Sequence, residues 1–165
     1  MQLTEYLDKH KDTFREKIIE KLSKDYSISA EQVSKEFADA IENFMKNKYH
    51  PIEPVVSEIY KIDKPIILVI RRDRSREDKC KICESNEPIL ISLGSKYQDK
   101  IKIFEISEDH PEGRLYHIIY QDYVKQEEKL LPLIAIIYKG DIRKYWAGKT
   151  IELSVYDRYL KEILF

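Results

Sequence analysis

Residues 66–88, IILVIRRDRSREDKCKICESNEP, carry the most informative pattern in the chain. The stretch from Ile66 to Ile70 is apolar at every position and mostly β-branched, which is typical of a strand buried on both faces of a sheet. A charged loop from Arg71 to Lys79 follows. Cys80-Lys81-Ile82-Cys83 then places the only two cysteines of the chain at the spacing of a dithiol or disulfide pair.

A C-x-x-C pair by itself has several interpretations. It supplies half of a zinc or iron-sulfur site, it forms a local structural disulfide, or it is a redox-active dithiol. A four-thiolate site would need two more cysteines, and the histidines are scattered rather than paired at ligand spacing; they are His10, His50, His110 and His117. We therefore expect no metal and no cofactor, and the structural and redox readings both stay open.

Length and composition indicate the size of the protein and the character of its surface. The chain has 165 residues, enough for one domain with a small appendage. Charged residues make up 36% while the net charge is −1, so we expect a surface of mixed sign and no nucleic-acid partner. The abundance of Lys and Glu is similar to that of hyperthermophile proteins, whose cytosol tolerates structural disulfides.

The sequence also bears on location. No apolar run approaches the roughly 20 residues that span a bilayer, and the first residues lack the basic-then-apolar order of a secretory signal. We therefore expect a cytoplasmic protein with no membrane association.

The N-terminal third reads as helical. Apolar residues recur at helical intervals from Leu3 to about Lys24, and Ser29 followed by Gln32 predicts the start of a second helix. The buried stripe expected for that helix is Val33, Phe37, Ala40, Ile41 and Phe44. Pro51 and Pro54 end it. We expect residues 1–52 to be a helical extension that either packs on a domain at 53–165 or serves as an arm for homodimerisation or partner docking.

Residues 53–165 predict an alternation of strands and helices. After an edge strand at Val55 to Ile62 and the buried strand at Ile66 to Ile70, a helix carries the cysteines up to a turn near Gly94. A strand at 100–107, a partly helical stretch at 111–129 and an apolar strand at 133–138 follow. A short turn, a hairpin partner at 142–146 and a helix from about Ile151 complete the order β-α-β-α-β-β-α.

From about residue 55 onward, the chain resembles the thioredoxin-like superfamily. In that family a proline follows the second cysteine by five residues, as Pro88 does here, and a cis-proline is followed by two glycines at eight-residue intervals, as Pro132, Gly140 and Gly148 stand here. The resemblance implies an α/β fold, namely a three-layer α/β/α domain with a central mixed sheet. It also implies a cis-proline, Pro132, that faces the cysteine pair.

The resemblance further implies an activity. A thiol–disulfide oxidoreductase would use Cys80 as the nucleophile and Cys83 as the resolving thiol, with protein disulfides as substrates and an unidentified electron donor or acceptor as partner. Cys80 would lie at a helix N-terminus, where unpaired N–H groups favour a thiolate. Lys79 and Lys81 favour the thiolate as well, whereas the neighbouring carboxylates of Glu77, Asp78 and Glu84 oppose it.

Three departures from the family pattern argue against ordinary thioredoxin. The tryptophan before the first cysteine is missing, Lys81-Ile82 separates the cysteines, and apolar Ile70 stands where the family has a buried acid. The connections at 71–79 and 111–131 are also longer than usual. The alternative is therefore a non-catalytic thioredoxin-like interaction module in which the C-x-x-C is structural.

Two further features have two readings each. The basic cluster Arg71, Arg72, Arg74 and Arg76 would suit an acidic partner, but the interspersed acids favour a solvated loop. Trp146 with Tyr145 is either a surface anchor or part of core or cross-strand packing, and packing is favoured.

Overall fold

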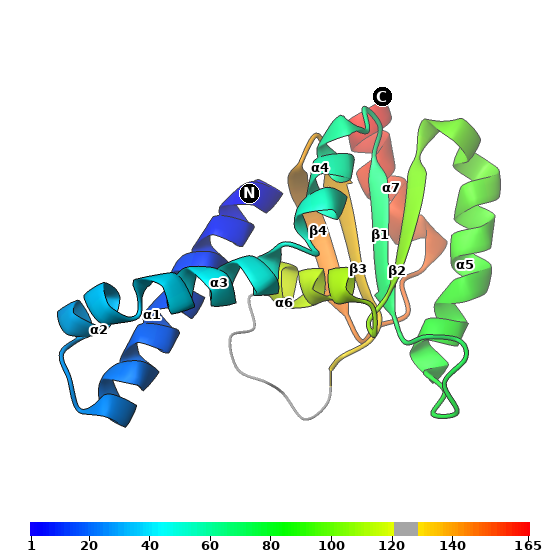
Figure 1. The fold of residues 1–165 in the computed structure, drawn as a ribbon. Helices are drawn as coiled ribbons and strands as arrows, with labels where there is room; N and C mark the ends of the chain where they lie inside the picture. The colour runs from blue at the N-terminus through cyan, green and yellow to red at the C-terminus, as the bar shows by residue number, and fades with distance from the viewer. Residues whose placement is uncertain (121–128) are drawn as a thin grey trace.

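A computed structural model describes residues 1–120 and 129–165 and has the predicted α/β class. Within that part of the chain, four strands form a mixed sheet in the order β2-β1-β3-β4 (Figure 1). The strands are β1 (Ile66–Arg71), β2 (Lys102–Ser107), β3 (Leu133–Tyr138) and β4 (Asp141–Ala147). β1 is parallel to β2 and antiparallel to β3, which pairs antiparallel with β4.

Helices cover both faces of this sheet (Figure 1). The helices on one face are α5 (Lys81–Tyr97) and α7 (Leu153–Leu164), and those on the other include α1 (Leu3–Tyr26), α4 (Glu53–Lys61) and α6 (Leu115–Tyr120). Successive side chains of β1 alternate between the two apolar clusters: Leu68 faces α4 and α6, whereas Val69 faces α5 and α7. This alternation explains why β1 must be apolar at every position.

The connections between the strands agree with the predicted order. The 3-10 turn η1 (Gln98–Lys100) follows α5, which continues past the predicted turn at Gly94 to Tyr97. Between β2 and β3, η2 (Pro111–Arg114) leads into α6. The remainder of the predicted helical stretch at 111–129 lies mostly outside the described residues.

The expected edge strand at Val55 to Ile62 is wrong, because these residues form α4. Proline is favoured in the first turn of a helix, where its missing N–H costs nothing, and Pro54 stands there. The buried side chains Val55, Val56 and Ile59 lie at helical spacing on the face toward the sheet. The β-branched residues therefore indicate burial here rather than strand structure.

The predicted second helix is divided into α2 (Ala30–Glu36) and α3 (Ala38–Tyr49). The Ser29 hydroxyl accepts a hydrogen bond from the Gln32 N–H at 3.1 Å, which caps α2 as predicted. Phe37 separates the helices with non-helical dihedral angles, φ −108° and ψ 16°. The break shifts the buried stripe to Ile41, Met45 and Tyr49, so two members of the predicted stripe, Ala40 and Phe44, are exposed instead.

The start of α1 docks on the turn between β3 and β4. The Leu3 N–H donates to the Gly140 carbonyl at 2.8 Å, and the Ile142 N–H donates to the Met1 carbonyl at 3.1 Å. Gly140 has a φ of 77°, and a Cβ there would lie 2.1 Å from the Tyr60 ring, so glycine is required. Residues from both predicted parts of the chain, 1–52 and 53–165, contribute to one apolar cluster. The boundary between residues 52 and 53 stays a prediction.

Candidate functional site at Cys80 and Cys83

Cys80 is the residue that begins α5. Its backbone is extended, with φ −98° and ψ 100°, and its Sγ accepts a hydrogen bond from the Cys83 N–H at 3.1 Å. A disulfide joins Cys80 to Cys83, whose Cα atoms are 5.2 Å apart. The sulfur of Cys80 therefore occupies the position where the unpaired N–H groups of a helix favour negative charge.

The two cysteines differ in access to solvent. Cys80 is partly exposed, while Cys83 is 2% exposed and packs in the apolar cluster that contains Ile70. Attack by an external thiolate or disulfide needs access, so only the Cys80 sulfur is placed to meet a large partner. Cys83 is placed to react with Cys80 alone.

The segment before β3 lies against the disulfide. The Leu131–Pro132 peptide bond is cis, and the Cys80 Sγ is 3.9 Å from the Leu131 carbonyl oxygen. The Gly148 N–H donates to the Pro132 carbonyl at 3.0 Å, which ties this segment to the end of β4. The structure thus brings Cys80, Cys83 and Pro132 into one region, with Pro132 itself buried.

A buried tyrosine positions the residues that precede Pro132. The Tyr116 hydroxyl donates to the Leu130 carbonyl at 3.1 Å and accepts from the Leu130 N–H at 3.1 Å. Tyr116 belongs to α6 and is fully buried. The Leu130 side chain is 50% exposed, and Ile82 between the cysteines is 38% exposed. Ile82, between the cysteines, and Leu130, two residues before Pro132, thus both present apolar surface to solvent.

The arginines of the basic cluster are paired within the molecule. Arg71 is 6% exposed and donates to Glu87 of α5 at 2.6 Å. Arg74 contacts the same carboxylate at 2.6 Å and also pairs with Glu105 of β2. The hydrogen bond from Arg74 is the largest cause that lowers the pKa of Glu87. Arg71 is thus a buried residue of β1 and not part of a solvated loop, while Arg74 ties the loop to α5 and β2 through ion pairs.

The charges next to Cys80 are also partly committed. Lys79 donates from its ammonium to the Arg74 carbonyl at 2.7 Å, while Lys81 is exposed. Asp78 binds the Arg76 guanidinium at 2.8 Å, and that hydrogen bond lowers the pKa of Asp78. Of the three carboxylates expected to oppose a thiolate, Asp78 is therefore compensated by an arginine.

Asn86 is a site-forming residue that the sequence reasoning missed. It is 1% exposed and lies between Cys83 and Pro88 on α5. Its amide donates to the carbonyls of Ile82 at 2.8 Å and Lys149 at 3.1 Å, and its oxygen accepts from the Ile151 N–H at 3.0 Å. Asn86 thereby fixes the first turns of α5 to the loop before α7. An asparagine inside an apolar helical stripe was the available signal.

Trp146 packs against the core on the α7 side of the sheet. Its ring meets Tyr156 at 6.1 Å and Tyr159 at 5.8 Å between centroids, both edge to face on α7. It therefore belongs to the layer between β4 and α7 and not to the region of the disulfide.

No known family model and no curated protein matches this chain in sequence. Across residues 1–120 and 129–165, no helix combines the length and apolar character needed to cross a membrane. Within the same residues, no three His, Cys, Asp or Glu side chains are grouped as ligands for a metal ion.

Proposed function

We propose that the chain is a thioredoxin-like thiol–disulfide oxidoreductase that acts on protein disulfides through Cys80 and Cys83. The observation that carries the proposal is the unequal exposure of two bonded cysteines at the start of α5: Cys80 is partly exposed and Cys83 is buried. The strand order β2-β1-β3-β4, the Leu131 carbonyl beside Cys80 and the glycine at 148 support the family assignment.

The reaction needs only the two cysteines and a partner disulfide. In the reduced protein, the Cys80 thiolate attacks one substrate sulfur, a mixed disulfide forms, and the other substrate sulfur leaves as a thiolate that takes a proton. The Cys83 thiolate then attacks the Cys80 sulfur, which releases the second substrate thiol. The dithiol thus loses two electrons and two protons to the substrate, and an external dithiol returns them.

The local structure assists this sequence at two points. The N–H of Cys83 already donates to the Cys80 sulfur at 3.1 Å, and the same donor would stabilise a Cys80 thiolate. Lys81 adds an exposed positive charge on the first turn of α5. Both act on Cys80 rather than on Cys83, so they favour Cys80 as the nucleophile.

A non-catalytic role has one specific observation in its favour. Ile70 is fully buried and packs in the same apolar cluster as Cys83, at the position where the resemblance implies a buried acid. Without that carboxylate, proton removal from Cys83 has to rely on solvent or substrate. Under this alternative, the domain binds a partner protein and the disulfide holds the start of α5.

Insulin reduction driven by dithiothreitol separates the two functions. We expect the wild-type chain to accelerate precipitation of the insulin B chain, and Cys80→Ser to lose that acceleration. Ile91→Ser is the matched control, because Ile91 lies on the same helix and is 70% exposed. Equal rates for wild type and Cys80→Ser would refute the oxidoreductase proposal.

Thiol reactivity gives an independent measurement. In the reduced protein we expect Cys80 to react with iodoacetamide at least roughly tenfold faster than Cys83, because thiolate character and access both favour it. A Cys83→Ser variant should accumulate mixed disulfides with its protein substrates through Cys80. Two thiols that react slowly and at the same rate would support the interaction module instead.

A further inference from the structure

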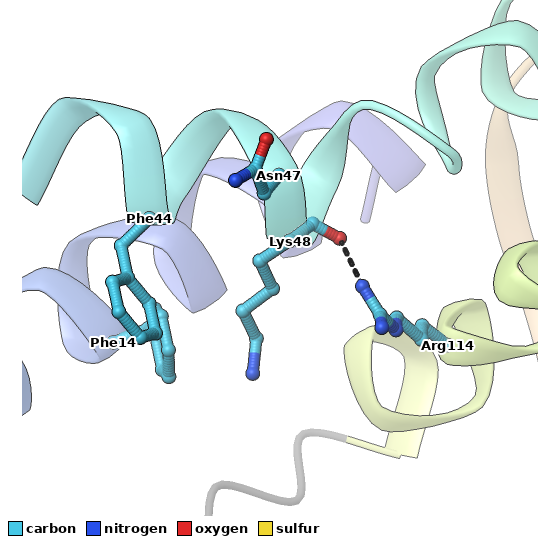
Figure 2. A pocket seen from close by; sticks show the side chains of 5 residues that line it. All are labelled: Phe14, Phe44, Asn47, Lys48 and Arg114. Atoms are coloured by element: carbon cyan, nitrogen blue, oxygen red, sulfur yellow. Dashed lines mark hydrogen bonds between the residues drawn. The ribbon is translucent and has the colours of Figure 1, made fainter.

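A second candidate site lies far along the sequence from the cysteines, in a hollow among α1, α3 and η2 (Figure 2). Its volume is about 370 Å³, and its lining residues are Phe14, Phe44, Asn47, Lys48 and Arg114. This is within the size range of small-molecule pockets, which begins at about 300 Å³.

The lining combines positive charge with aromatic surface. Figure 2 shows the Lys48 side chain extending between the phenylalanines and Arg114. The Lys48 Nζ lies 3.7 Å from the centroid of the Phe14 ring, and Arg114 donates to the Lys48 carbonyl at 3.2 Å. Two cations thus lie in one hollow, and among residues 1–120 and 129–165 neither forms an ion pair with a carboxylate.

Two carboxylates of α3 and α4 pair with cations of α1. Glu42, on the same helix as Lys48, forms an ion pair with Arg15. Glu53 of α4 lies 3.9 Å from the Lys11 ammonium. Burial first and the positive charge of Arg114 second lower the pKa of Lys48. The negative charge of an anion in the hollow would favour the protonated Lys48 and so oppose the effects of burial and of Arg114.

Phe44 gives the site its apolar surface. Its side chain is 64% exposed, which is unusual for a phenylalanine on a helix whose other apolar residues, Ile41 and Met45, are buried. A flat ring placed against Phe44 would remove this apolar surface from water, and an attached anionic group would reach the two cations.

We propose that the hollow binds a small aromatic anion, with an aryl group against Phe44 and a phosphate or carboxylate between Lys48 and Arg114. The volume favours a small molecule over a folded partner, and the charges define its sign. This site does not depend on the redox activity proposed for Cys80. It gives the N-terminal helices a role of their own.

Calorimetric titration of the full chain with phenyl phosphate tests the proposal. Inorganic phosphate lacks the ring and benzyl alcohol lacks the charge, so each should bind at least roughly tenfold more weakly than phenyl phosphate. Titration with benzoate distinguishes a carboxylate ligand from a phosphate ligand, and binding of either supports the ligand class. Absence of binding by both compounds at about 10 mM would overturn the proposal.

Variants locate the binding. Lys48→Gln and Arg114→Gln should each weaken phenyl phosphate binding at least roughly tenfold, since each removes a charged hydrogen bond. Phe44→Ala should weaken it severalfold without unfolding the chain, because the side chain is exposed. The control is Lys46→Gln, which removes the same charge from an exposed position on α3. Equal weakening by the Lys46 and Lys48 variants would show nonspecific attraction and refute the site.

Discussion

Asn86 offers the sharpest test of how the first turns of α5 are held. Its side chain is 1% exposed and makes three hydrogen bonds, to the carbonyls of Ile82 and Lys149 and from the N–H of Ile151. Asn86→Ala removes all three. It also leaves the N–H of Ile151, a buried residue, without this acceptor.

The expected cost follows from these contacts. A typical intramolecular hydrogen bond contributes about 1 kcal/mol net, and an unsatisfied buried donor costs about 1–3 kcal/mol. Alanine returns roughly 0.5 kcal/mol through its better helix propensity. Two bonds to carbonyls at about 1 kcal/mol each, plus about 1–3 kcal/mol for the unpaired Ile151 N–H and less that gain, give a loss of about 2.5–4.5 kcal/mol in the free energy of unfolding. The Tm should fall by about 5–18 °C for a domain of this size.

Guanidinium unfolding followed by circular dichroism measures this loss. Asn43→Ala is the matched control, because Asn43 is an exposed asparagine in the interior of α3. It should leave the free energy of unfolding within about 0.5 kcal/mol of wild type. If Asn86→Ala loses less than about 1 kcal/mol, the three hydrogen bonds do not hold α5 as argued.

Asn86→Asp adds a pH signature to the same test. An aspartate would keep an acceptor for Ile151 but face two carbonyl oxygens, and burial would raise its pKa. The folded state would then bind a proton more readily than the unfolded state, so stability should fall as pH rises above the unfolded pKa of about 3.9. Stability of this variant that is independent of pH between about 4 and 7 would contradict a buried carboxylate at this position.

Other elements of the fold give three further predictions. The buried Tyr156 hydroxyl has no hydrogen-bond partner in the described structure, so Tyr156→Phe should leave thermal stability unchanged or raise it by up to about 1 kcal/mol, and a loss above that would refute the orphaned hydroxyl. Hydrogen bonds from Lys96 first and Tyr97 second lower the pKa of Asp157. Its stabilising effect should be complete above the ordinary carboxyl pKa and disappear as pH falls through the lowered one, so the stability gap between wild type and Asp157→Asn should narrow from pH 7 to pH 2 in urea titrations. Gly140→Ala should lower Tm by several degrees, because φ is 77° and a Cβ would meet the tyrosine ring of α4 at 2.1 Å; an unchanged Tm would show that the turn adapts.

The predicted secondary structure is confirmed where one pattern of apolar residues dominates a segment. The run at Ile66 to Ile70 is apolar throughout because it faces helices on both sides, and β1 is the buried strand expected. The resemblance implied that Cys80 lies at a helix N-terminus, and Cys80 is the N-cap residue of α5. For β1, local propensity and tertiary packing agree, so local reasoning sufficed.

The failures occur where the same residues suit two structures. Val55 and Val56 favour strands by propensity, but Pro54 in the first turn and packing against the sheet select the helix α4. The break at Phe37 that shifts the buried face of α3 has no proline or glycine to mark it. Asn86 was missed because its partners, Lys149 and Ile151, are distant in sequence. Contacts of that kind become visible only once the chain is folded.

The same packing bears on how the N-terminal helices relate to the disulfide. Cys83 packs in the apolar cluster that also contains Leu7 of α1, Met45 of α3 and Ile59 of α4. Cys80, in contrast, is partly exposed and contacts the Leu131 carbonyl at the edge of that cluster. Cys83 and the N-terminal helices therefore share one apolar cluster, whereas Cys80 is only partly buried against it.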